Sequence, residues 1–96
     1  MRTDKRKSMD SKALDKVSES GILPVIAIPS LAAAVPLADA FVAGGISSIE
    51  VTLRNPWALD AIRAIRTAHP DMAIGAGTIL FEEQVSAAQQ AGADFL

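Results

Sequence analysis

The chain has 96 residues, half of them hydrophobic, and a formal net charge of −2. This length indicates one small domain, and this composition excludes a largely disordered chain. The charge gives no support for nucleic-acid binding through phosphate neutralisation, and the absence of cysteine excludes disulfides and thiol catalysis.

Charge is distributed unevenly along the chain. Residues 1–16 hold six of the nine Lys and Arg residues, whereas residues 17–96 hold eight of the eleven acidic ones. The basic segment lacks the apolar region of a secretory signal, and no run reaches the ~18 apolar residues of a membrane span. We therefore interpret residues 1–20 as a basic leader with a short amphipathic helix at 8–20. We predict no membrane partner, and the sequence is compatible with a cytoplasmic location.

The rest of the chain alternates between predicted strands and predicted helices. Strands are predicted at 22–28, 46–53 and 72–78, and helices at 30–43, 55–68 and 81–91. Residues 93–96 begin a fourth strand. The strands start about every 24 residues, which predicts βαβ units and a parallel sheet whose strands are buried on both faces.

The helix at 55–68 shows the clearest boundary signals. Asn55 is predicted to be its N-cap and Pro56 its first residue. Its charged residues are predicted to point outward, and these are Asp60, Arg63 and Arg66.

The strand at 46–53 carries a polar face. Residues 49–54 read Ile-Glu-Val-Thr-Leu-Arg, so that Glu50, Thr52 and Arg54 share the face opposite the apolar residues. Charged groups inside a sheet covered on both faces are unfavourable unless they are paired or carry chemistry. Four residues along a strand span ~13 Å, which is too far for a direct Glu50–Arg54 ion pair. From spacing alone, a functional role and a structural role stay equally open.

Two α/β folds are compatible with this pattern. A doubly wound sheet usually has a glycine-rich turn after its first strand, but the turn at 29–31 has no glycine. A (β/α)8 barrel keeps its chemistry at the C-terminal ends of its strands, where Glu50, Arg54 and Thr78 fall. We therefore predict an α/β fold of the TIM-barrel class, with residues 21–96 as its N-terminal half, about three and a half βα units.

Four segments together resemble the N-terminal half of the 2-keto-3-deoxy-6-phosphogluconate (KDPG) aldolases, many of which also act on 4-hydroxy-2-oxoglutarate. The resemblance extends from about residue 12 to Leu96. Its segments are Leu-Pro-Val-Ile at 23–26, Ala-Phe-Val-Ala-Gly-Gly-Ile at 40–46, Ile-Glu-Val-Thr-Leu-Arg at 49–54 and Ile-Gly-Ala-Gly-Thr-Ile-Leu at 74–80.

The resemblance implies a barrel enzyme, usually a trimer, that cleaves KDPG to pyruvate and glyceraldehyde 3-phosphate through a lysine Schiff base, without a metal or other cofactor. It implies that Glu50 is the acid–base carboxylate, that Arg54 binds the carboxylate of the keto acid, and that Thr78 is a further pyruvate-binding residue. The planar fork of arginine suits a carboxylate. Arg54, together with the lack of an arginine just after the first strand, is similar to the gluconate-specific group, not the galactonate-specific one.

Every lysine lies in the first sixteen residues, at Lys5, Lys7, Lys12 and Lys16. A Schiff-base nucleophile must be a neutral amine, usually in a desolvated pocket, and none of these lysines can be placed on an inner strand. In the family the nucleophile comes from a later strand. We therefore expect this chain to be part of a longer aldolase and to be inactive alone. The alternative is a non-catalytic half-barrel that self-associates through open sheet edges.

Several other residues receive structural interpretations. His69 is interpreted as a solvated loop histidine, and Thr78 has the alternative of capping the next turn. Gly75 and Gly77 are interpreted as allowing close packing of helix on strand. Trp57 has two open interpretations, as part of the site or as a helix-packing residue.

Overall fold

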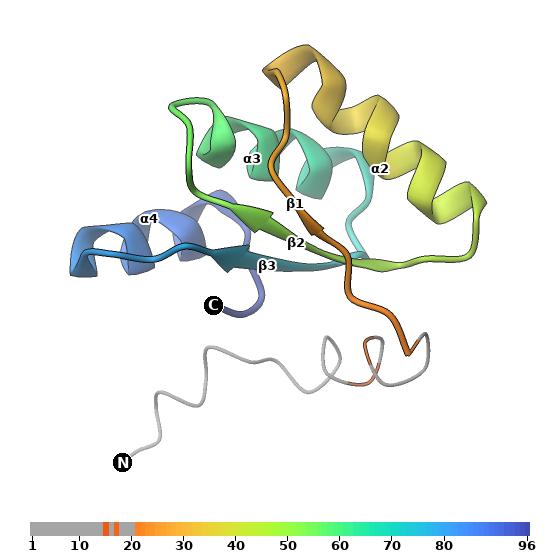
Figure 1. Ribbon diagram of the computed structural model, residues 1–96. Coiled ribbons are helices and arrows are strands. Elements are labelled where there is room, and N and C mark those ends of the chain that lie inside the picture. The colour runs from red at the N-terminus through yellow and green to blue at the C-terminus, as the bar shows by residue number, and fades with distance from the viewer. Residues whose placement is uncertain (1–14, 16, 18–20) are drawn as a thin grey trace.

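The computed structural model describes Asp15, Val17 and residues 21–96. The elements are β1 (Val25–Ile26), η2 (Leu31–Ala33), α2 (Ala34–Ala43), β2 (Ser48–Thr52), α3 (Ala58–Ala68), β3 (Ala73–Gly77) and α4 (Glu82–Ala91). The strands form a parallel sheet in the order β1-β2-β3, and Phe95 extends it through a parallel bridge to Gly75 (Figure 1). The predicted parallel α/β arrangement is therefore confirmed. The predicted helix at 8–20 lies outside the described residues, apart from Asp15 and Val17, which are helical.

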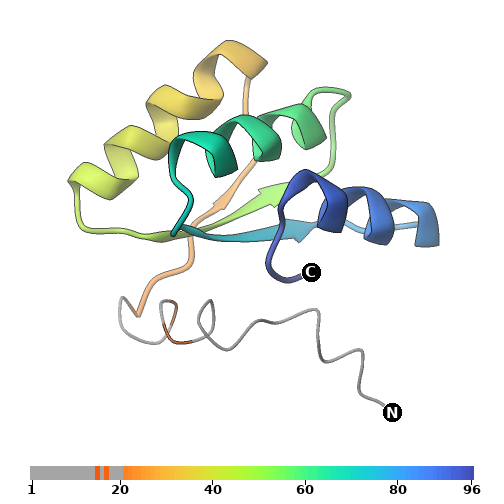
Figure 2. The ribbon, with the colours of Figure 1, turned by 180° about the vertical axis from the view of Figure 1, so that it is seen from behind.

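Helices α2, α3 and α4 pack on the same face of the sheet (Figures 1 and 2). Ile49 and Val51 of β2 belong to one buried cluster with Ile62 and Ile65 of α3, and α2 and α4 contribute buried alanines to it. A doubly wound sheet has helices on both faces, whereas a barrel wall has them only on the outside. This arrangement therefore matches part of a barrel wall. None of the helices in the described ranges is long and apolar enough to span a membrane.

The first strand is shorter and more exposed than predicted. The strand expected at 22–28 is reduced to Val25–Ile26, and Val25 is 63% exposed. Val25 lies on the face opposite the helices, and β1 pairs only with β2 among the described strands. The prediction that this strand is buried on both faces is therefore wrong.

The segment between β2 and α3 is tied to the end of β1. The Asn55 side-chain amide donates a hydrogen bond to the Ile28 carbonyl at 3.2 Å, and the Trp57 indole N–H donates to the same oxygen at 2.7 Å. Helix α3 begins only at Ala58, so the prediction of Asn55 as N-cap and Pro56 as first helical residue is wrong. Trp57 has a structural role, because its only side-chain donor holds the segment before α3 against the segment after β1.

The predicted outer face of α3 contains one exception. Arg63 is 52% exposed and pairs with Asp60 at 2.6 Å, as expected of an outward side chain. Arg66, by contrast, is only 23% exposed, and its guanidinium donates to backbone carbonyls in the segments that precede β3 and Phe95. The prediction that Arg66 points into solvent is therefore wrong.

Candidate active site

β2 places Glu50 on the face of the sheet opposite α2, α3 and α4. The register pairs Glu50 with Val25 on one side and with Gly75 on the other, and the side chain is half-buried. The carboxylate leans along β3 toward Gly77. A β-carbon built on Gly77 would overlap Oε2 of Glu50 and lie 3.1 Å from Cδ. The carboxylate can therefore occupy this position only because residue 77 has no side chain.

Arg54 and Thr78 leave the sheet side by side at its C-terminal edge. Thr52 pairs with Gly77, and the Leu53 amide donates to the Gly77 carbonyl at 2.9 Å, so the two strands stay paired up to their ends. Arg54 and Thr78 are the next residues along their strands, and both are exposed. The register therefore places Arg54 and Thr78 just beyond the C-terminal ends of neighbouring strands, and Glu50 two residues before the end of β2.

Thr78 adopts a backbone conformation that is rare for its residue type. Its φ is 59°, and among the described residues it is the only non-glycine with a positive φ. For a β-branched residue this is an outlier, and such strain gathers at ligand-binding positions. The alternative role of capping the next turn is filled by Gln84, whose side-chain oxygen accepts from the amides of Leu80 and Phe81 at 2.6 and 3.1 Å.

Among the polar residues at 50–54, only Thr52 makes a side-chain hydrogen bond. The Thr52 hydroxyl is buried and donates to the Ile26 carbonyl at 3.4 Å. Within the described part of the chain, Glu50 and Arg54 make neither a salt bridge with each other nor another side-chain hydrogen bond. Both ionic groups are therefore available to a ligand. No cluster of three or more metal-ligating side chains occurs among residues 21–96.

Gly75 and Gly77 have a different role from the one predicted. A β-carbon on Gly75 would overlap the ring of Phe95, and one on Gly77 would overlap the Glu50 carboxylate. Both glycines therefore face away from the helices, and the prediction that they allow close helix–strand packing is wrong. The alternation of β3 contains this information, because Ile74 and Ala76 occupy the helix-facing positions.

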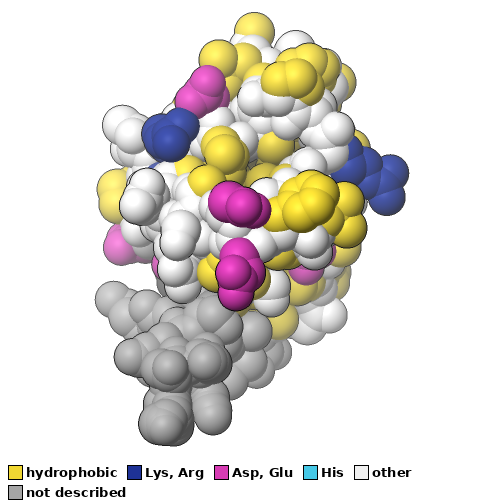
Figure 3. Space-filling model, turned by 90° about the vertical axis from the view of Figure 1, so that its left-hand side faces the viewer, with side chains coloured by type: hydrophobic (Ala, Val, Ile, Leu, Met, Phe, Trp, Pro, Cys, Tyr) yellow, Lys and Arg dark blue, Asp and Glu magenta, His cyan; other side chains and the backbone are white. Residues whose placement is uncertain are grey.

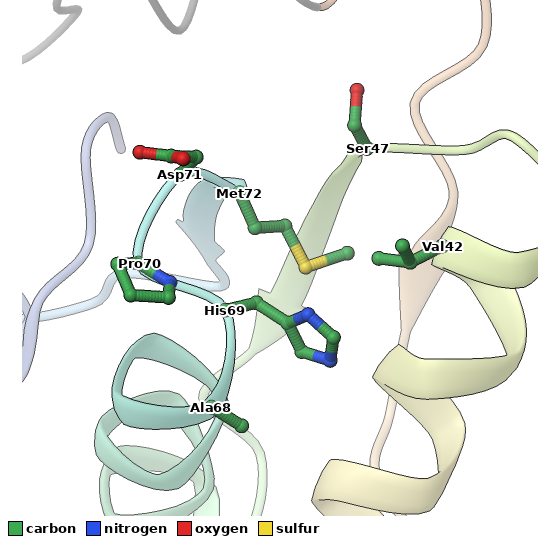
Figure 4. A pocket seen from close by; sticks show the side chains of 7 residues that line it. All are labelled: Val42, Ser47, Ala68, His69, Pro70, Asp71 and Met72. Atoms are coloured by element: carbon green, nitrogen blue, oxygen red, sulfur yellow. The ribbon is translucent and has the colours of Figure 1, made fainter.

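A separate pocket lies at the opposite, N-terminal end of the strands (Figure 4). It measures about 280 Å³ and is lined by Val42, Ser47, Ala68, His69, Pro70, Asp71 and Met72. His69 is 21% exposed, and its Nε2 lies 2.6 Å from Oδ1 of Asp39, so the prediction of a solvated, unpartnered histidine is wrong. Barrel enzymes carry their chemistry at the other end of the strands, and the pocket contains none of the predicted site residues.

Comparison with known proteins is decisive about the family. The family model described as KDPG and KHG aldolase matches residues 14–96. This chain belongs to that family. It is 43% identical over 89 residues to the KHG/KDPG aldolase of Escherichia coli, and 48% identical over 81 residues to the 2-dehydro-3-deoxy-phosphogluconate aldolase of Pseudoalteromonas atlantica.

Solved structures of the aldolase family agree with this assignment. A KDPG aldolase from Zymomonas mobilis matches 76% of this chain with a TM-score of 0.69 and 46% identity. The KDPG aldolase of Legionella pneumophila, with pyruvate captured as a covalent carbinolamine intermediate, matches 74% of this chain with a TM-score of 0.71 and 46% identity. The chain spans only part of its relatives, 42% of the E. coli protein and 38% of the P. atlantica protein.

Proposed function

We propose that this chain carries the acid–base and carboxylate-binding part of the active site of a class I aldolase. The substrate is KDPG, which is cleaved to pyruvate and glyceraldehyde 3-phosphate, and 4-hydroxy-2-oxoglutarate is a second substrate. One observation supports this most strongly: an uncommitted carboxylate, guanidinium and hydroxyl lie along the C-terminal edge of a helix-backed parallel sheet, in a chain that belongs to the KDPG and KHG aldolase family.

Each of the three side chains has a role that its chemistry suits. The guanidinium of Arg54 binds the substrate carboxylate with two parallel hydrogen bonds, and the hydroxyl of Thr78 supplies one more. An amine adds to the keto carbon to give a carbinolamine, which loses water to form an iminium ion. Glu50 then takes the proton of the C4 hydroxyl while the C3–C4 bond breaks and its electrons form an enamine, and later returns a proton to C3. Hydrolysis of the resulting iminium releases pyruvate.

The amine is the missing component of this site. Residues 21–96 contain no lysine, and Lys5, Lys7, Lys12 and Lys16 lie outside the described residues. We propose that the Schiff-base lysine and the phosphate-binding site belong to a part of the protein outside these 96 residues. The short coverage of the relatives supports this. A trimeric assembly remains a prediction of the resemblance, and a cytoplasmic location remains a prediction from the sequence.

A trapping experiment tests the proposal. The 96-residue chain is incubated with pyruvate and borohydride and its intact mass is measured, in parallel with a fusion of the chain to the part of the E. coli KHG/KDPG aldolase that follows the matched segment. We expect no reduced adduct on the chain alone and one adduct on the fusion. A folded fusion that forms no adduct and does not cleave KDPG would overturn the proposed function, and an adduct on the chain alone would refute the missing-lysine argument.

Exposed apolar side chains favour a second candidate, a self-associating half-barrel. Val25 on the β1 edge is 63% exposed, and Leu80 and Phe81, where β3 leads into α4, are 72% and 63% exposed. Figure 3, which views the side where α4 begins, shows hydrophobic and acidic side chains next to each other at the surface. Open strand edges and exposed apolar groups promote association. Sedimentation of the 96-residue chain distinguishes a 10.0 kDa monomer from a dimer or larger assembly.

A further inference from the structure

We propose that Gly77 is the positioning residue for the Glu50 carboxylate. This inference rests on the proposed function and adds a residue to its machinery. Glu50 pairs in register with Gly75, yet its carboxylate lies against the next inward position of β3, at Gly77. The missing side chain at residue 77 thus forms the recess that holds the base close to the strand end carrying Thr78.

The backbone around Gly77 has little freedom to move away from an added methyl group. On one side, the Leu53 amide donates to the Gly77 carbonyl at 2.9 Å. On the other side, the amide of the preceding residue, Ala76, donates to the Phe95 carbonyl at 2.9 Å. Because β3 is hydrogen-bonded on both sides, a β-carbon at residue 77 displaces the group it meets, which is the end of the flexible Glu50 side chain.

Gly75 provides the matched comparison on the same strand and the same face. A β-carbon there would overlap the Phe95 ring and lie 2.6 Å from its Cζ atom. Phe95 is 5% exposed, and a buried aromatic ring cannot shift without disturbing its packing. Gly75→Ala should therefore destabilise the fold and leave the Glu50 carboxylate in place, whereas Gly77→Ala should move the carboxylate and leave the fold stable.

The first experiment uses the 96-residue chain and needs no activity. The side-chain carboxyl carbon of Glu50 is observed by NMR, and thermal unfolding is followed by circular dichroism. We expect the Glu50 signal to shift in Gly77→Ala with a small change in Tm, and the reverse pattern in Gly75→Ala. An unchanged Glu50 signal in Gly77→Ala, or a loss of Tm as large as that in Gly75→Ala, would overturn the inference.

The second experiment asks whether Gly77 acts through Glu50. The fusion described above is assayed for exchange of the pyruvate methyl protons with deuterium, as wild type, Gly77→Ala, Glu50→Gln and the double variant. A displacement of about 1 Å costs roughly 100-fold in rate, so we expect kcat for Gly77→Ala to fall by about that factor with little change in KM for pyruvate. If the glycine acts only through the carboxylate, Gly77→Ala has no further effect in the Glu50→Gln background.

The outcomes separate this inference from the proposed function. The positioning role would be overturned if the rate losses of the two single variants multiply in the double variant. It would also be overturned if kcat for Gly77→Ala lies within threefold of wild type. The aldolase proposal would be refuted if the wild-type fusion folds but neither exchanges methyl protons nor forms an adduct. A shifted Glu50 signal in Gly77→Ala would still support the contact between Gly77 and Glu50 in that case.

Discussion

Replacement of Arg66 by lysine should destabilise the chain far more than the same change at Arg63. All five N–H groups of the Arg66 guanidinium donate hydrogen bonds. Their acceptors are the carbonyls of Gly92 (3.0 Å from Nε and 2.9 Å from Nη2), Pro70 (2.8 Å) and Met72 (2.7 Å), and Oδ2 of Asp94 (2.5 Å). Asp94 Oδ2 also accepts from the Ile74 amide at 2.9 Å. One side chain therefore joins α3, the segment before β3 and the segment before Phe95.

The magnitude follows from the number of bonds that a lysine cannot make. An ammonium group has three donors and no planar fork, so at least two of the five hydrogen bonds are lost. A hydrogen bond to a charged group contributes roughly 1.5–3 kcal/mol. The Arg66 and Asp94 side chains are 23% and 25% exposed, and water can replace part of the loss. We therefore expect Arg66→Lys to lower the free energy of unfolding by about 2 kcal/mol, or Tm by roughly 8–16 °C for a domain of this size.

Arg63→Lys is the matched control. Arg63 and Asp60 are 52% and 61% exposed, and an exposed pair contributes roughly 0–1 kcal/mol. Lysine keeps the charge that pairs with Asp60, so Tm should change by less than a few degrees. Both variants are made in the 96-residue chain and compared by urea and thermal unfolding. Equal effects of the two substitutions, or a change in Tm below about 3 °C for Arg66→Lys, would show that the Arg66 hydrogen bonds do not hold these segments together.

Three further predictions concern single positions. Gly92 and Gly45 both have positive φ, 115° and 89°, but only at Gly92 would a β-carbon contact the Arg66 stem, at 3.0 Å; Gly92→Ala should lower Tm clearly more than Gly45→Ala. Trp57→Phe keeps the ring but removes the indole donor, and should cost about 1 kcal/mol in urea unfolding; an unchanged midpoint would contradict the tether. In the active fusion, Arg54→Lys should raise KM for pyruvate at least tenfold, because a bidentate carboxylate contact is lost; a KM within twofold of wild type would exclude that contact.

Hydrophobic periodicity predicts the order of strands and helices, because the alternation of a strand and the 3.6-residue period of a helix are local properties of the chain. β2, β3, α3 and α4 fall inside the predicted ranges, with ends that differ by at most three residues. The polar face of β2 was also readable, since alternation alone puts Glu50 and Arg54 on one side. The predicted start of the helix at 55–68 is wrong because a tertiary contact competes with the local capping signal. Asn55 is a good N-cap by type, but its amide bonds to Ile28, which is 27 positions away in sequence.

Arg66 and His69 show why partners are harder to predict than elements. On α3, Arg66 stands in the same polar pattern as Arg63, so the pattern predicted solvent exposure for both. Four of its five hydrogen bonds go to backbone carbonyls, which carry no side-chain signature, and the fifth goes to Asp94, 28 positions away in sequence. The contact of His69 with Asp39 joins residues 30 positions apart on different elements. These interactions exist only after the βα units have packed together.

The two ends of the sheet are stabilised in different ways. At the N-terminal ends of the strands, Arg66 donates to backbone carbonyls and Asp94, and His69 contacts Asp39. At the C-terminal ends, Glu50 and Arg54 have no side-chain partner among the described residues, and Thr78 holds a strained φ. Backbone strain at Thr78 and the partial burial of the unpaired Glu50 carboxylate both cost stability, so the contacts in the rest of the fold must offset them. The same contrast appears along β3, where the Phe95 ring packs on Gly75 and the carboxylate of Glu50, the proposed base, lies against Gly77.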